Sequence, residues 1–290
     1  AATPDTTRTY QALQQCDLTV QISTKLNRSH VITGKQALIL PCLGRTEIDN
    51  QNSGEQCITV EDSMSMVHSS TGQNEPASQH LRSETAIVAG IAKAAVGEDV
   101  VNWTNLMSDY SLIRHDISKV LPDFSDYNQR IKIGRGFHLE NKAAQRQWKT
   151  RSSKAEFSSA LLPEQLAHEV AQAYTEKPIL TLQTSRSHDQ YNTSIYGMDD
   201  RYRERRVVFV NAEDMIKQQL KNGDKVKITT VSNDNIVRSI TDFKIVEYAI
   251  PQGCAAAYYP ETNPLVPLES TADNCGTPTY KSIAVTFDKL

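Results

Sequence analysis

The sequence predicts an α/β segment followed by a compact β-rich domain. Two short runs near the start, Asp17–Ser23 and Ala37–Leu40, are β-branched or apolar and are separated by polar turns. The second run stops at Pro41, as expected of a buried parallel strand. From Pro178 onward, short apolar runs alternate with turn signals, which is typical of a small β-barrel or sandwich. We therefore expect a domain boundary within residues 160–178.

The spacing of apolar residues predicts three helices in the first part and near the boundary. These helices cover Ser78–Val96, Asp109–Val120 and Glu164–Tyr174. The rest of the stretch between residues 99 and 154 is irregular. The run DNQNSG at residues 49–54 is rich in turn-forming residues and is predicted to be a loop.

The second part is predicted to contain four strands before a closing strand near the end of the chain. They are Ile179–Leu182, Arg206–Val210, Lys225–Val231 and Ile236–Val246. Asn211 follows the second of them and is itself followed by two carboxylates, which is the pattern of a helix N-cap.

Charge and hydropathy exclude two classes of partner. The 290 residues include 31 basic and 34 acidic side chains, so no basic excess indicates nucleic acid binding. The longest candidate for a membrane span, Thr85–Val96, is interrupted by Gly90 and Lys93 and is too short to cross a bilayer. The five cysteines are scattered and form no C-x2-C pair, which fits reduced thiols in a cytoplasmic protein.

No familiar catalytic motif is present. The sequence contains no G-x-S-x-G, H-E-x-x-H, P-loop or G-x-G-x-x-G pattern. A hydrolase using His188 with Asp189 or Ser187 is disfavoured, because neighbours on one loop rarely reach triad geometry. The histidines are dispersed, without the spacing of metal ligands. We predict no catalytic residue and no metal ligand in this chain.

The richest polar stretch, Thr184–Thr193, directly follows a predicted strand. Its sequence, TSRSHDQYNT, combines hydroxyls and amides with Arg186 and His188. Such a loop can donate hydrogen bonds to a phosphate or to the edge of a nucleotide. An ordinary solvated loop has a similar composition, so composition alone leaves the two interpretations equally open.

Four further positions each have a functional and a plain interpretation. Asn263 can pair with a heterocycle or form a turn, and Lys281 can meet a phosphate or lie on the surface. The segment Gly44–Glu47 follows a strand end, where ligands of open α/β sheets collect. Glu84 can bind guanine through two oxygens, although favourable charge at a helix start also explains a carboxylate there and is the preferred interpretation on that residue alone.

Taken together, these strings resemble one family. In chain order they are ALILP-x-L-G-R-T-E, R-S-E at a helix start, T-S-R-x(4)-Y-N-T, N-P-L and P-x-Y-K-x-x-A-V. They are similar to the C-terminal part of molybdopterin-dependent oxidoreductases of the formate dehydrogenase alpha-subunit type, in particular the acid-resistance-associated bacterial branch. The resemblance implies that residues 1–165 are the latter part of a Rossmann-like α/β domain with an irregular extension. Residues 166–290 would be a double-psi β-barrel domain that binds molybdopterin dinucleotide.

The resemblance also implies a cofactor, molybdenum bound by two molybdopterin guanine dinucleotides. Ser23 and Thr24 match a pair that touches one dinucleotide, and Glu84 stands where relatives often carry an Asp that binds guanine. The other matched positions lie in the polar loop and near the end of the chain: Thr184, Ser185, Arg186, Ser187, His188, Tyr191, Asn192, Thr193, Asn263 and Lys281.

The redox centre of such an enzyme has no counterpart in this sequence. The family's iron–sulfur cysteines and its metal-ligating Cys or selenocysteine lie in two earlier domains, and the start without Met fits a fragment that lacks them. Cys42 is better explained as a semi-buried thiol than as a metal ligand. We expect the chain to hold the guanine dinucleotides of a formate dehydrogenase-like enzyme together with the N-terminal domains, and to be inactive alone. The alternative is a non-catalytic nucleotide-binding or adaptor module with a barrel fold.

Overall fold

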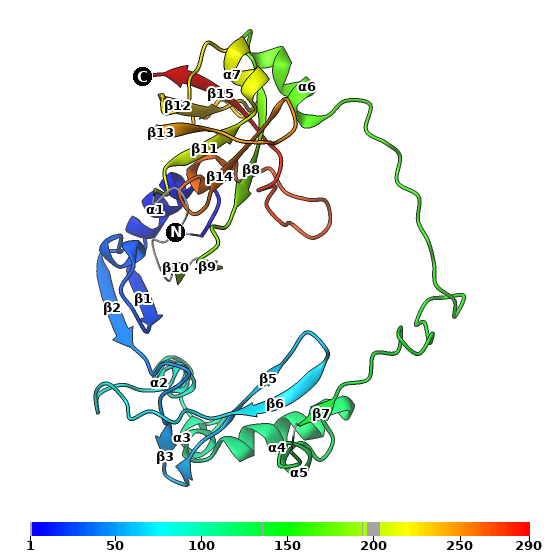
Figure 1. Ribbon diagram of the computed structural model, residues 1–290. Coiled ribbons are helices and arrows are strands. Elements are labelled where there is room, and N and C mark those ends of the chain that lie inside the picture. Colours follow the sequence, from blue (N-terminus) through cyan, green and yellow to red (C-terminus); the bar gives the residue numbers. More distant parts are fainter. Residues whose placement is uncertain (1, 135, 193, 196–203) are drawn as a thin grey trace. The chain divides into compact units, whose positions relative to one another are not determined.

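A computed structural model describes residues 2–134, 136–192, 194–195 and 204–290. The chain divides into two compact units, whose elements are labelled in Figure 1. The first, called the barrel unit, contains Ala1–Asp17, Val31–Lys35 and Leu161–Leu290. The second, called the sheet–helix unit, contains Leu18–His30 and Gln36–Ala160. The N-terminal helix therefore belongs with the C-terminal strands.

The barrel unit is built around a closed six-stranded barrel, which confirms the prediction of a β-barrel. The strand order is β11-β13-β12-β15-β8-β14. The pairs β11/β13 and β8/β14 are parallel and the other pairs are antiparallel. The strands cover Leu180–Ser185 (β8), Val207–Val210 (β11), Lys225–Thr230 (β12), Ser239–Glu247 (β13), Cys254–Tyr258 (β14) and Ile283–Lys289 (β15).

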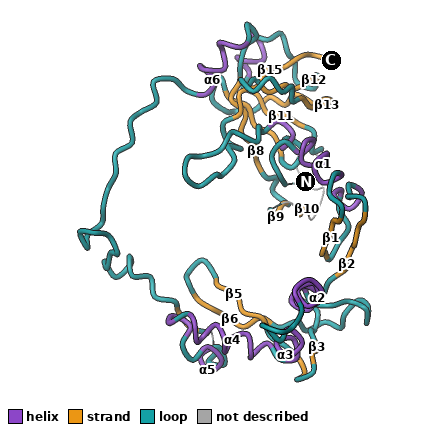
Figure 2. The backbone as a smooth tube through the Cα atoms, turned by 180° about the vertical axis from the view of Figure 1, so that it is seen from behind, coloured by secondary structure: helices purple, strands orange, loops and turns teal. Residues whose placement is uncertain are grey.

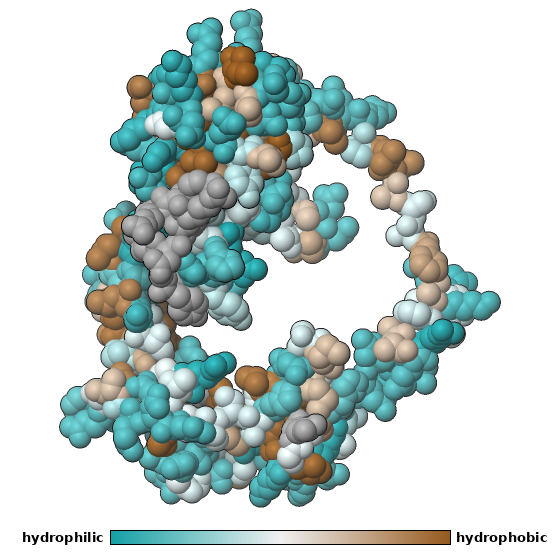
Figure 3. Space-filling model, in the orientation of Figure 1, coloured by the Kyte–Doolittle hydropathy of each residue, from teal (hydrophilic) through white to brown (hydrophobic). Residues whose placement is uncertain are grey.

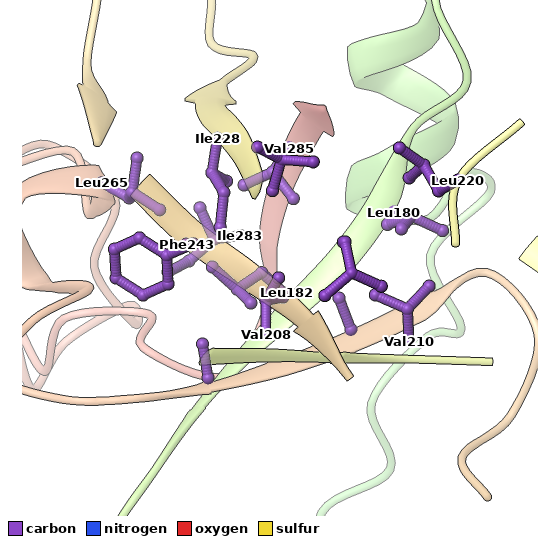
Figure 4. Packing of buried hydrophobic residues seen from close by; sticks show 14 of the residues in the cluster. Leu180, Leu182, Val208, Val210, Leu220, Ile228, Phe243, Leu265, Ile283 and Val285 are labelled. Carbon is purple, nitrogen blue, oxygen red and sulfur yellow. The ribbon is translucent and has the colours of Figure 1, made fainter. Parts of the chain in front are cut away.

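The barrel is filled by branched aliphatic side chains and one phenylalanine. Along β12 every second residue is buried, as expected when one row of side chains points inward. Leu182, Ile228, Phe243 and Val285 are fully or almost fully buried in this core (Figure 4). Each such side chain contributes about 1.5–3 kcal/mol to folding. On β8 the inward row ends at Thr184, which places this residue at one end of the filled interior.

Short helices and turns join or flank the strands of this unit. Helix α7 (Ala212–Lys217) begins as predicted, because the Asn211 side chain accepts a hydrogen bond from the Glu213 backbone N–H at 2.9 Å. The helix predicted at Glu164–Tyr174 begins three residues later in the structure. It consists of α6 (Ala167–Ala171) followed by a 3-10 turn (Gln172–Tyr174). The remaining elements are α1 (Thr6–Gln14), α6 (Ala167–Ala171), the 3-10 turns Gln172–Tyr174 and Asn263–Leu265, and the short hairpin of β9 (Gln190–Tyr191) and β10 (Ser194–Ile195).

A buried ion-pair network fixes the N-terminal segment to the barrel. Arg238 Nε lies 2.7 Å from Asp5 Oδ2, and its Nη2 lies 2.7 Å from Asp234 Oδ2. The side chains of Arg238 and Asp5 are only 2% and 3% exposed. The backbone N–H of Asp5 also donates to the Val266 carbonyl at 2.9 Å. The start of α1 is therefore an integral part of the barrel unit.

The sheet–helix unit contains the predicted parallel strand pair, but the pair is not buried. Strand β1 (Leu18–Ser23) pairs in parallel with β2 (Gln36–Pro41) in a two-stranded sheet. Leu18, Leu38 and Ile39 remain 51%, 48% and 44% exposed, and apolar atoms are visible over these strands in Figure 3. The prediction of a buried strand was wrong for this chain, since the described residues do not cover the faces that parallel sheets normally bury.

The rest of this unit is a small sheet with short helices. Strands β5 (Ile58–Glu61), β6 (Met66–Ser70) and β7 (Phe137–His138) form an antiparallel sheet, which lies beside α4 and α5 in Figures 1 and 2. Val67, Tyr127, Ile131 and Phe137 form its core. The loop predicted at residues 49–54 contains most of a short hairpin, which is formed by β3 (Asn50–Gln51) and β4 (Gly54–Glu55). The other elements are a 3-10 turn (Arg28–Val31), β3 (Asn50–Gln51), β4 (Gly54–Glu55), α2 (Glu84–Val96), α3 (Trp103–Ser108), α4 (Tyr110–Val120), a 3-10 turn (Pro122–Phe124) and α5 (Tyr127–Arg130).

Helix α2 is six residues shorter at its start than the helix predicted from Ser78. Its first residue is Glu84, because the Ser83 side chain accepts a hydrogen bond from the Ala86 backbone N–H at 3.2 Å and caps the helix. Within the described ranges, no helix combines the length and the apolar character needed to cross a bilayer.

Candidate functional site

A cavity of about 250 Å³ at one end of the barrel brings three of the predicted site residues together. Thr184, Asn263 and Lys281 line it, with Ala2, Tyr259 and Tyr280. Thr184 lies near the end of β8, Asn263 begins a 3-10 turn, and Lys281 lies two residues before the start of β15. The backbone N–H of Thr184 donates to the Tyr280 carbonyl at 3.0 Å, which fixes the β8 end beside Lys281.

Lys281 is the cation of this cavity. Its ammonium group donates a hydrogen bond to the backbone carbonyl of Thr184. Burial, together with repulsion from Arg186, lowers the pKa of Lys281 below its ordinary value. Two positive side chains held close together favour the binding of an anion, because an anion relieves their repulsion.

Asn263 is fully buried and held by the turn that follows β14. Its backbone N–H donates to the Pro260 carbonyl at 3.1 Å, and the Thr262 hydroxyl donates to the Tyr258 carbonyl at 2.9 Å. The amide of Asn263 therefore reaches the cavity from a well-supported backbone. An amide carries both a donor and an acceptor, as recognition of a heterocycle requires.

The polar loop after β8 divides its side chains between the interior and the surface. Thr184 and Ser187 are buried and Ser185 is half-buried, whereas Arg186, His188, Tyr191 and Asn192 are exposed. The carbonyl of Ser185 accepts a hydrogen bond from the Tyr259 backbone N–H at 3.0 Å. The exposed side chains of the loop are thus a cation, an imidazole, a phenol and an amide. Thr193 lies outside the described residues.

A second pocket, of about 510 Å³, gathers the other predicted residues in the sheet–helix unit. Ser23, Thr24 and Glu84 line it together with Cys42 and Arg45. It lies at the carboxyl ends of β1 and β2, where the Cys42 backbone N–H donates to the Ser23 carbonyl at 3.2 Å and the Leu43 N–H donates to the Arg82 carbonyl at 3.0 Å. This is the edge at which open α/β sheets bind ligands.

The carboxylates of this pocket have different roles. Glu47 accepts hydrogen bonds at 2.6 Å from the backbone N–H groups of Gly44 and Ala77, which lower its pKa and tie two loops together. Asp49 accepts a hydrogen bond at 2.6 Å from Tyr110, whose pKa rises to about 12, mainly through burial. Glu84 is exposed and makes no hydrogen bond or ion pair with any residue that the structure describes. Its carboxylate is therefore the one available to a ligand among these three.

Cys42 lies in the same pocket but does not belong to a metal-ligand group. It is buried, and burial together with the charge of Glu84 raises the pKa of its thiol. Across the described residues, no three His, Cys, Asp or Glu side chains come together in a group that could hold a metal ion.

Sequence reasoning missed Arg205 and Glu261 in the barrel unit. Arg205 Nε lies 2.7 Å from Glu261 Oε1, and the guanidinium reaches the polar loop as well. Arg205 stands in the charged run RYRERR, in which every position looks like a solvated surface residue. No pattern in the sequence distinguishes the largely buried Arg205 from its exposed neighbour Arg206.

Comparison with known proteins shows which family the barrel resembles. Residues 180–284 match the family described as the molydopterin dinucleotide binding domain. The match spans the barrel from β8 into β15. The match begins at β8 and includes the polar loop, Asn263 and Lys281, so the cavity at the barrel end lies within a dinucleotide-binding domain.

Whole-chain relatives extend the match to the sheet–helix unit. The chain is 46% identical over 293 residues to Protein YdeP of Escherichia coli and 46% identical over 302 residues to an uncharacterized oxidoreductase of Mycobacterium tuberculosis. In both cases 99% of this chain is covered, but it spans only 38% and 37% of the length of these relatives. Together with the domain match, they confirm the resemblance to a part of a molybdopterin oxidoreductase.

A solved structure supports the fold. The acetylene hydratase of Pelobacter acetylenicus matches with a TM-score of 0.68 at 15% identity, covering 99% of this chain and 42% of that chain. At this identity the likeness concerns the fold alone. The Rossmann-like and double-psi assignments of the two parts, and the domain limits at residues 165 and 166, remain predictions.

Proposed function

We propose that this chain holds both guanine dinucleotides of a molybdenum bis(molybdopterin guanine dinucleotide) cofactor in a formate dehydrogenase-like oxidoreductase. The observation that carries the proposal is that Thr184, Asn263 and Lys281, from three distant segments, line one cavity inside a molybdopterin dinucleotide binding domain. The relatives named as oxidoreductases, at 46% identity, favour redox chemistry over the hydration named for the structural neighbour.

The donors of the barrel cavity fit part of a dinucleotide. Lys281 and Arg186 supply positive charge suited to a pyrophosphate, and the buried Asn263 amide suits a base or pterin edge. A volume of about 250 Å³ lies below the range of about 300–1,000 Å³ usual for whole ligands. The cavity therefore takes one group of the dinucleotide, while the exposed side chains of the polar loop bind the remainder.

The donors of the second pocket fit the other dinucleotide. Glu84 can accept hydrogen bonds from the two N–H groups on the Watson–Crick edge of guanine. Ser23 and Thr24 offer hydroxyls, and the exposed Arg45 side chain offers a cation for a phosphate. At about 510 Å³ this pocket can take a nucleoside.

The part played by the chain is binding and orientation. When bound, the molybdenum of such a cofactor supplies two-electron redox chemistry, for which formate is the proposed substrate. Lys281 and Arg186 neutralise phosphate charge, and Asn263 and Glu84 fix the heterocycles. The iron–sulfur cluster and the catalytic ligands are proposed to belong to N-terminal domains of the same protein, so the 290-residue chain is expected to be inactive alone.

A nucleotide titration tests the proposal. GDP carries the guanine and pyrophosphate of the cofactor, and the wild-type chain should bind it more tightly than ADP in isothermal titration calorimetry. Hydrogen exchange with GDP bound should show protection in residues 184–192 and near Glu84. Equal binding of ADP and GDP would support the alternative of a general nucleotide-binding adaptor. Absence of GDP binding in both regions would contradict the proposal.

A further inference from the structure

Arg205 stands between two loops that carry proposed site residues in the barrel unit. One is the polar loop after β8, and the other is the turn Tyr259–Asn263 after β14. Arg205 itself lies just before β11, and its side chain is only 14% exposed. A largely buried guanidinium at this position requires several partners, because an unpaired buried charge is strongly unfavourable.

The guanidinium binds both loops at once. Toward the turn, Nε donates to Glu261 Oε1 at 2.7 Å and Nη2 to Glu261 Oε2 at 2.9 Å, a bidentate pair. Nη2 also donates to the Tyr259 carbonyl at 2.7 Å. Toward the polar loop, Nη1 donates to the Ser187 hydroxyl at 2.8 Å and Nη2 to Gln190 Oε1 at 3.0 Å.

Gln190, in the polar loop, also hydrogen-bonds to the turn after β14. Its Nε2 donates at 2.8 Å to the Asn192 carbonyl, within its own loop, and at 2.8 Å to the Tyr259 carbonyl of the turn. Its Oε1 accepts from the Ser187 backbone N–H at 3.2 Å as well as from Arg205. Both Ser187 and Gln190 are buried, so this network is shielded from water.

We infer that Arg205 is a positioning residue that joins the polar loop and the Asn263 turn into one dinucleotide-binding surface. The inference rests on the proposed function. With Ser187 held inward, Arg186 and His188 on either side of it are exposed, which leaves both side chains available to a ligand. With Glu261 and Tyr259 held, the turn that carries Asn263 keeps its place at the cavity.

Lysine cannot replace this side chain. A guanidinium has five N–H donors in a fixed plane, whereas an ammonium is a point charge on a flexible stem. Arg205→Lys keeps the charge but loses the bidentate pair and the simultaneous reach to both loops. Arg206, the next residue, offers a matched control, because its side chain is exposed and, among the residues that the structure describes, donates only to the Thr241 carbonyl, at 3.0 Å.

The test measures GDP binding and hydrogen exchange on the full 290-residue chain. We expect Arg205→Lys and Arg205→Ala to weaken GDP binding about 10-fold to 100-fold, by analogy with the loss seen when the hydrogen-bond partners of metal ligands are mutated. Arg206→Lys and Arg206→Ala should leave the affinity unchanged. Circular dichroism and the melting temperature check that the barrel remains folded, and Glu261→Gln provides a second variant in which the guanidinium is retained.

Hydrogen exchange without ligand separates this inference from the proposed function. Arg205→Lys and Glu261→Gln should each raise exchange in both residues 186–192 and residues 259–263, while β12 and β15 stay protected. Faster exchange in only one loop, or wild-type GDP affinity in both Arg205 variants, would overturn the inference. If the wild-type chain binds no GDP at all, the proposed function fails, and the exchange measurement still decides whether Arg205 couples the loops.

Discussion

The Lys281 ammonium donates its hydrogen bond to the backbone carbonyl of Thr184, a residue 97 positions earlier in the sequence. The contact joins the segment just before β15 to the end of β8, and the two strands pair antiparallel from Ile283 opposite Leu182 onward. The cation is thereby held in a fixed position at the cavity, and no acidic side chain among the described residues pairs with it and would compete with an anionic ligand.

We predict that Lys281→Met weakens GDP binding about ten-fold or more. Hydrogen bonds to charged groups contribute about 1.5–3 kcal/mol, and methionine keeps the aliphatic stem while removing the charge. Calorimetric titration measures the effect. Lys217→Met, on the exposed face of α7, is the matched control and should bind GDP as the wild type does. Unchanged affinity in Lys281→Met would show that the cavity does not bind the diphosphate.

We predict that Glu84→Gln abolishes the preference for guanine at the second pocket. A carboxylate can accept from both N1–H and the 2-amino group of guanine, and such a bidentate pair is worth about 1–3 kcal/mol. IDP lacks the 2-amino group, so wild-type chain should protect residues near Glu84 from exchange more strongly with GDP than with IDP. Glu75→Gln, at an exposed position, serves as the control. Equal protection by IDP and GDP in the wild type would contradict the role of Glu84.

Removing Asp5 should destabilise the barrel unit. Asp5→Ala leaves Arg238, whose side chain is 2% exposed, with one carboxylate instead of two. Breaking a buried ion pair on one side costs about 3 kcal/mol or more. Urea unfolding monitored by circular dichroism measures the loss. Asp17→Asn removes an exposed partner of Lys35 and should have little effect. A similarly small loss in Asp5→Ala would mean that water reaches Arg238.

The ion pair between Arg238 and Asp234 in this network predicts that the free energy of unfolding falls at acidic pH. The hydrogen bond from Arg238 holds the pKa of Asp234 well below its ordinary value of 3.8. A carboxyl group with a lowered pKa in the folded state stabilises the protein fully above its unfolded pKa, and this contribution is lost as the pH falls below about 4 toward the folded pKa. Unfolding free energies at several pH values between 6 and 2 should therefore decline less steeply for Asp234→Asn than for the wild type.

Local patterns predicted much of the barrel but not all of it. The runs at β11 and β12 are β-branched and bounded by turns, so their strands were placed within a residue or two. Strand β14 was missed because its sequence, CAAAY, lacks β-branched residues. Its alanines are selected by close packing against β8 and β11, which no local pattern records.

The site was predicted where a motif marks it and missed where only tertiary contacts do. Thr184, Asn263 and Lys281 belong to recognisable strings, and the structure brings them to one cavity. Arg205 and Glu261 are 56 residues apart and become partners only when the loops meet. The exposure of β1 and β2 was likewise unpredictable, because periodicity shows which residues are apolar but not what covers them.

The buried Asp5–Arg238 pair has a consequence for how the chain folds during synthesis. Its two members are 233 residues apart, and β15, which closes the barrel between β12 and β8, is made last. Residues 1–17 are made before the rest of the barrel unit but cannot reach their packed position until the barrel strands have followed. The sheet–helix unit, which lies between them in sequence, can fold earlier. Premature termination between the end of β14 at Tyr258 and the start of β15 at Ile283 would leave an open barrel with unpaired strand edges, a substrate for chaperones and proteases rather than a smaller binding domain.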